Sequence, residues 1–72
     1  MTKQQVISLA VERLGTPGFL EENDIYGFMS TILEVLVDGG IREDHFFGTT
    51  DENKASDILY LMAEEVRTLH FA

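Results

Sequence analysis

The chain has 72 residues, a formal net charge of −8 and no cysteine. This length predicts one domain, 1–72, that buries only about 60% of the surface exposed by the unfolded chain, so the core is small. The acidic balance argues against nucleic acid and anionic membranes as partners, because both are bound through lysine and arginine. Disulfides and thiolate metal sites are excluded. Since no apolar run is long enough for a secretory signal or a membrane span, we expect a soluble protein of the cytoplasm.

The first predicted helix covers 3–14. Thr2 and Gln5 have the spacing of a capping box, and Gly15 is well placed to end the helix because glycine adopts the left-handed conformation easily. Apolar residues recur along this segment at helical spacing, which predicts one buried face made of Val6, Ile7, Ala10, Val11 and Leu14.

Thr16, Pro17 and Gly18 predict a turn, or alternatively a single helical turn that begins at Pro17 and runs through Glu22. Pro17 and Gly18 interrupt the helical pattern, and proline is tolerated at the first position of a single helical turn. We expect Phe19 and Leu20 to fold back from this turn onto the core.

The second predicted helix covers 24–38, with Asn23 as its N-cap, and Gly39 and Gly40 end it. Its apolar residues occupy most of the circumference, whereas a surface helix has an apolar face of about 100°. We therefore expect it to be the central, most buried helix, or to be covered by a second copy of the chain. Its polar residues form one narrow stripe, made of Gly27, Ser30, Thr31, Glu34 and Asp38.

The third predicted helix covers 50–70 and follows a loop at 40–50 that has room for a short helical turn at 41–46. Thr49 and Glu52 again have capping-box spacing. A heptad-like seam predicts the buried face, made of Ala55, Leu59, Met62, Val66 and Leu69, and it is widened by Ile58, Tyr60 and Leu61. The sequence therefore predicts an all-α fold, a small antiparallel bundle of three helices, or of four if the turn in the loop is counted.

Catalytic and metal-binding patterns are missing from the sequence. His45 and His70 lie far apart and lack the spacing of metal ligands. Ser8, Ser30 and Ser56 lack the context of a catalytic nucleophile, and no glycine-rich phosphate loop is present. We expect no catalytic, cofactor-binding or metal site, and a protein that is not an enzyme.

Acyl carrier proteins are also small acidic helical bundles, and they carry a prosthetic arm on the serine of an Asp-Ser-Leu motif. Here Ser30 lies between Met29 and Thr31, and Ser56 precedes Asp57. The chain is similar to these carriers in size and charge alone, so no carrier function is predicted.

Acidic and aromatic residues gather at the predicted junction of the second and third helices. If the helices are antiparallel, these residues share one pole of the bundle. Aromatic side chains surrounded by charge are typical interface anchors; the alternative is that both phenylalanines plug the open end of the bundle. The predicted partner-binding residues are Asp38, Glu43, Asp44, His45, Phe46, Phe47, Asp51 and Glu52.

The sequence favours a small acidic binding protein without enzymatic activity. We expect it to inhibit or antagonise a basic partner protein, such as one that handles nucleic acid, without direct contact with nucleic acid or membrane. Phage anti-defence proteins and toxin-immunity proteins are similar to it in size and charge. The alternative is a self-associating structural or assembly module, a two-fold homodimer in contact through the apolar second helix.

Overall fold

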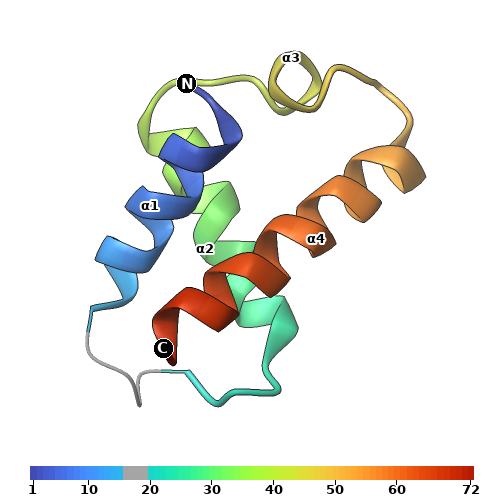
Figure 1. Cartoon of the computed structure of the whole chain (residues 1–72). Coiled ribbons are helices and arrows are strands. Elements are labelled where there is room, and N and C mark those ends of the chain that lie inside the picture. The colour runs from blue at the N-terminus through green and yellow to red at the C-terminus, as the bar shows by residue number, and fades with distance from the viewer. Residues whose placement is uncertain (16–19) are drawn as a thin grey trace.

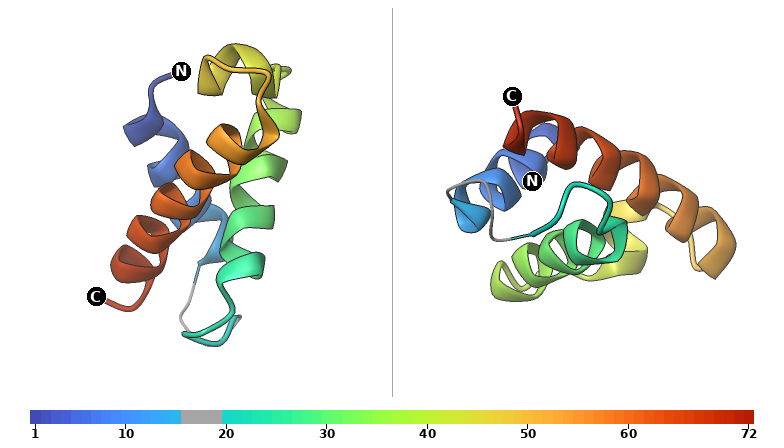
Figure 2. Two further views of the ribbon diagram at one scale, coloured as in Figure 1. Left: turned by 90° about the vertical axis from the view of Figure 1, so that its right-hand side faces the viewer. Right: turned by 90° about the horizontal axis from the view of Figure 1, so that it is seen from below.

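The computed structural model describes residues 1–15 and 20–72, and this part of the chain contains four helices and no strand. The helices are α1 (Lys3–Leu14), α2 (Ile25–Asp38), α3 (Glu43–Phe47) and α4 (Glu52–His70). α2 runs opposite to α1 and α4, and the termini lie at opposite ends (Figures 1 and 2). The predicted all-α bundle is confirmed. The expectations for Pro17 and Phe19 fall outside the described residues. None of the four helices is both long and apolar enough to cross a membrane.

α1 has the predicted bounds, and local hydrogen bonds explain them. The Thr2 backbone N–H donates to Gln5 Oε1 at 2.8 Å, and the Gln5 N–H donates to Thr2 Oγ1 at 3.1 Å. This capping box satisfies donors that the first turn of a helix leaves free. Gly15 ends α1 with a φ of 67°, which a residue with a side chain rarely adopts.

The cap of α2 is Asp24, so the prediction of Asn23 is wrong. The Asp24 Oδ1 atom accepts a hydrogen bond from the Gly27 N–H at 3.0 Å. An aspartate cap has the advantage of its negative charge, which interacts favourably with the N-terminal end of the helix dipole.

Part of the predicted polar stripe of α2 is buried. Thr31 lies in the core, where its hydroxyl donates to the Gly27 carbonyl at 2.9 Å. Leu20 folds back as predicted and packs against the core. A Cβ atom at Gly27 would lie 3.0 Å from both Leu20 methyl carbons, so Gly27 permits a close approach of the segment before the helix. The stripe is solvated at Ser30, Glu34 and Asp38 alone.

α4 begins one residue after Asp51, which is its cap. Asp51 Oδ1 accepts hydrogen bonds from the N–H groups of Asn53 at 2.9 Å and Lys54 at 3.3 Å. The predicted capping box of Thr49 and Glu52 is therefore wrong. Thr49 instead accepts a hydrogen bond from the Asp51 N–H through its hydroxyl, at 3.1 Å, and so holds the cap in place.

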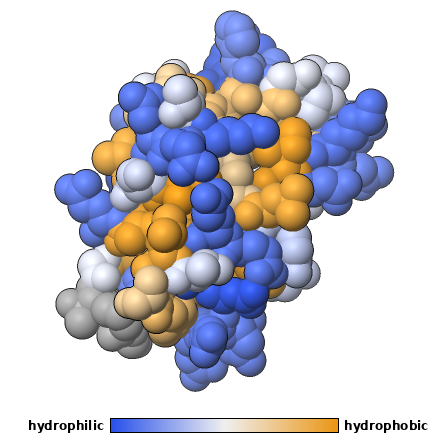
Figure 3. Space-filling view, viewed as in Figure 1, coloured by the Kyte–Doolittle hydropathy of each residue, from blue (hydrophilic) through white to orange (hydrophobic). Residues whose placement is uncertain are grey.

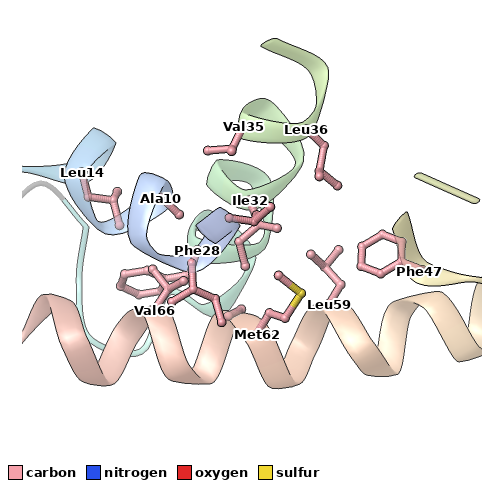
Figure 4. Packing of buried hydrophobic residues seen from close by; sticks show 13 residues of the cluster. Ala10, Leu14, Phe28, Ile32, Val35, Leu36, Phe47, Leu59, Met62 and Val66 are labelled. Atoms are coloured by element: carbon pink, nitrogen blue, oxygen red, sulfur yellow. The ribbon is translucent and has the colours of Figure 1, made fainter. Parts of the chain in front are cut away.

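α1, α2 and α4 each pack against the other two, so α2 contributes one side of a three-helix core and is not enclosed by the other helices. Phe28, Ile32 and Leu36 are fully buried, and they point into the space between the other two long helices (Figure 4). Tyr26 and Val37, on its outer side, remain 77% and 70% exposed. The core consists of Val6, Ile7, Ala10, Leu14, Phe28, Ile32, Val35, Leu36, Phe47, Leu59, Met62, Ala63 and Val66.

The predicted seam of α4 is buried over most of its length but not at its end. Leu59, Met62 and Val66 are core residues, whereas Leu69 is 48% exposed. The buried row continues at His70 instead. An α-helix has 3.6 residues per turn, so a strict heptad spacing drifts away from the buried face as the helix proceeds.

We expect Leu59→Ala and Leu69→Ala to differ sharply in stability, although the sequence assigns both residues to one seam. Truncating the buried Leu59 removes core contacts and leaves a cavity, which costs about 2–5 kcal/mol. Truncating the half-exposed Leu69 changes the free energy of unfolding by about 0.5 kcal/mol, as is usual at surfaces. Urea unfolding of both variants measures the difference, and equal losses would contradict the position of α4.

Candidate functional site

The predicted partner-binding residues lie at one end of the molecule. This end is formed by the C-terminal turn of α2, all of α3 and the N-terminal turn of α4, which follow one another along the upper edge of Figure 1. We call its carboxylates the acidic end; they are Asp38, Glu43, Asp44, Asp51 and Glu52.

Two glycine breaks place α3 across this end. After α2, the Ile41 N–H donates to the Leu36 carbonyl at 2.9 Å, while Gly40 has a φ of 67°. The predicted turn at 41–46 is a helix at 43–47. Gly48 ends it in the left-handed conformation, with a φ of 71°, and turns the chain toward α4.

Arginines neutralise two carboxylates of the acidic end. Arg13, which reaches over from α1, forms an ion pair with Asp38 and lies 3.6 Å from Glu34. Arg42 contacts Asp44 through two hydrogen bonds, at 2.7 and 3.2 Å. These bonds, together with the positive charge of the guanidinium, lower the pKa of the Asp44 carboxyl from its ordinary value. Asp38 and Asp44 therefore contribute less uncompensated charge than the sequence suggested.

The other three carboxylates of the acidic end have no ion pair within the described residues. Asp51 caps α4, and Glu43 and Glu52 lie in the first turns of α3 and α4. All three are exposed. They therefore carry the uncompensated negative charge of this end of the molecule.

The aromatic residues of α3 point inward. Phe47 is only 8% exposed and joins the core, and Phe46 is half-buried against it. Their rings meet edge to face, with 5.2 Å between centroids. His45 is exposed beside them. This packing is the plug alternative of the sequence analysis, so in the free protein the two rings close the end of the bundle.

His70 is the one histidine in the core, and no described residue bonds to its ring nitrogens. Its ring lies edge-on to Phe28 and Phe71, with centroid distances of 6.0 and 4.8 Å. His45 lies on a different helix and is exposed. Over residues 1–15 and 20–72, no three side chains of His, Asp or Glu gather in a way that could hold a metal ion.

The sequence analysis missed one surface feature, a groove between α1 and α4. Ile7 and Met62 form its floor, and Leu61, although 68% exposed, lines its wall. The heptad pattern assigned Leu61 to a widened core. Only the crossing of α1 and α4 reveals that this leucine faces solvent.

The chain was compared with protein-family models, curated proteins and solved structures, and none of them matches it.

We expect Phe47→Ala to destabilise the free protein more than Phe46→Ala does. Removal of a buried phenylalanine ring costs about 3–5 kcal/mol, which is comparable with the whole stability of a domain this small. Phe46 is half-buried, so its loss leaves a smaller cavity. Thermal unfolding of the two variants compares their losses of stability. A larger loss in Phe46→Ala would show that Phe46, and not Phe47, is the more buried ring.

We expect His70→Leu to leave the free energy of unfolding unchanged or to raise it by about 1 kcal/mol. An apolar side chain of similar size has no ring nitrogen to desolvate, and it keeps the contacts with Phe28. Urea unfolding at neutral pH measures the change. A clear loss of stability would mean that the imidazole ring contributes more through its edge-on contacts with Phe28 and Phe71 than its desolvation costs.

Proposed function

We propose that the protein is a non-enzymatic acidic binding protein that inhibits or antagonises a basic partner protein. The observation that carries the proposal is the distribution of its acids. All three arginines form ion pairs with acids of the same chain, and these pairs involve Glu34, Asp38, Asp44 and Glu64. Thirteen acids less these four leave nine, and every one of the nine is exposed.

Such a surface favours a partner with excess lysine and arginine. Uncompensated charge attracts an oppositely charged protein over distances of about 10 Å at moderate salt and speeds its association. Nucleic acids and anionic membranes are repelled by the same field. A basic protein that handles nucleic acid would be attracted by this surface. Phage anti-defence proteins and toxin-immunity proteins inhibit partners of this kind, and we propose a similar role for this chain. A cysteine-free chain is compatible with the reducing cytoplasm.

Within this surface, the acidic end is our proposed contact region. Glu43, Asp51 and Glu52 carry its uncompensated charge. A shallow hollow lies next to them, and it is lined by Arg42, Asp44, His45, Gly48, Thr49 and Thr50. Donors and acceptors around a hollow can form directional contacts with a partner that the charge has attracted.

The test is a pair of matched charge reversals. Glu43→Lys with Glu52→Lys changes the acidic end, whereas Glu21→Lys with Glu22→Lys makes the same change in net charge at the opposite end of the molecule (Figure 1). We expect the first pair to slow association with a partner recovered from the native host by about tenfold, and to weaken its salt dependence. The second pair should have a much smaller effect.

Association rates are measured at low and physiological salt, after melting curves have shown that both variants are folded. Equal slowing by both pairs would mean that net charge matters and the acidic end does not. Binding that ignores ionic strength and both reversals would refute the proposed function.

A further inference from the structure

α4 carries a second row of residues at helical spacing, beside its buried row. Lys54, Ile58, Leu61 and Glu65 follow one another at intervals of four, three and four residues, so they lie on one side of the helix. Ile58 is half-buried, and the other three are exposed, with Leu61 at 68%. This row has an apolar centre, a cation at one end and an anion at the other.

Ile58, Leu61 and Glu65 of this row form one wall of the groove between α1 and α4, and Lys54 lies one turn before Ile58 on the same side of α4. Lys3 and Gln4 of α1 form the opposite wall, and Gln4 Nε2 donates to Glu65 Oε1 across the groove at 3.4 Å. Figure 3 shows hydrophobic side chains in separate areas on this face of the molecule, with hydrophilic ones between them. We call this surface the α1–α4 face; it consists of Lys3, Gln4, Lys54, Ile58, Leu61 and Glu65.

Charge distinguishes the α1–α4 face from the rest of the molecule. Neither Lys3 nor Lys54 forms an ion pair with any described residue, whereas all three arginines do. Both of these lysines lie on the face that also exposes Leu61. Unpaired positive charge is unusual on this chain, because its net charge is −8. An occupant of this face must offer an apolar side chain flanked by at least one carboxylate.

We propose that a second copy of the chain occupies the α1–α4 face, with the two α4 helices antiparallel about a two-fold axis. In this arrangement Ile58 of each copy packs against Leu61 of the other, and Lys54 of each copy meets Glu65 of the other. A two-fold axis makes every such contact twice, so one row supplies two apolar contacts and two ion pairs. Antiparallel helices with heptad-like rows pair in this way.

The order of charges in the row selects this orientation. Parallel α4 helices would place Lys54 against Lys54 and Glu65 against Glu65, and like charges across an interface are unfavourable. The same surface on a second copy matches the antiparallel row in both charge and spacing. The outer side of α2 offers Tyr26 and Val37 to a partner, but no lysine or arginine lies beside them in that helix.

Sedimentation equilibrium at physiological salt tests for the dimer. We expect the mass to rise with concentration toward twice the 8.1 kDa of the chain. Leu61→Glu should abolish the dimer, because it buries two carboxylates at the centre of the interface. Val37→Glu is the matched control: Val37 is 70% exposed, on the outer side of α2, so the dimer should persist. Circular dichroism checks that both variants keep their helices.

Charge exchange tests the antiparallel register. Lys54→Glu alone and Glu65→Lys alone each create two like-charge contacts, so each should raise the dissociation constant about tenfold. The double variant, Lys54→Glu with Glu65→Lys, restores opposite charges and should return the constant toward that of the wild type.

Three results would overturn the proposal. A wild-type mass that stays at 8.1 kDa into the millimolar range would exclude the dimer. Loss of the dimer in Val37→Glu and not in Leu61→Glu would place the interface on α2. A double variant no tighter than the single ones would exclude the antiparallel pairing of Lys54 with Glu65.

Discussion

The burial of one face of α2 against both α1 and α4 is the constraint on which the other features of the molecule depend. A chain of 72 residues has little surface to bury, so it can form only a small core. Each long helix contributes one continuous row of apolar side chains to that core. Phe28, Ile32 and Leu36 provide the row that touches both neighbours (Figure 4). Phe47 of α3 then packs onto one end of this core.

Packing also determines which charges remain uncompensated. Because α1 crosses α2, Arg13 reaches Asp38, an acid far from it in sequence. Such exposed pairs contribute little to stability, but they change the surface that a partner meets. With the arginines paired to acids of the same chain, positive charge is left mainly on the lysines of the α1–α4 face, and negative charge dominates the acidic end.

The two proposed surfaces share no residue. The acidic end would act through long-range attraction, which depends on salt and on net charge near the contact. The α1–α4 face would act through close packing around Leu61, with short-range pairs at its edges. Different residues carry the two interactions. A variant that prevents dimerisation through the α1–α4 face therefore still allows partner binding at the acidic end to be measured. The apolar second helix, which the sequence suggested as the self-association surface, is now largely accounted for by the core.

The sequence by itself determined the helices, because their signals are local. Glycines at the breaks, the capping box of Thr2 and Gln5, and apolar residues at helical spacing depend on neighbours within one or two turns. Tertiary structure decided how far the buried face of each helix extends. Leu59, Leu61 and Leu69 are chemically alike and all fit an apolar pattern, yet Leu59 alone is in the core. Periodicity describes the width of an apolar face, but only the crossing of α1, α2 and α4 decides which part of that width another helix covers.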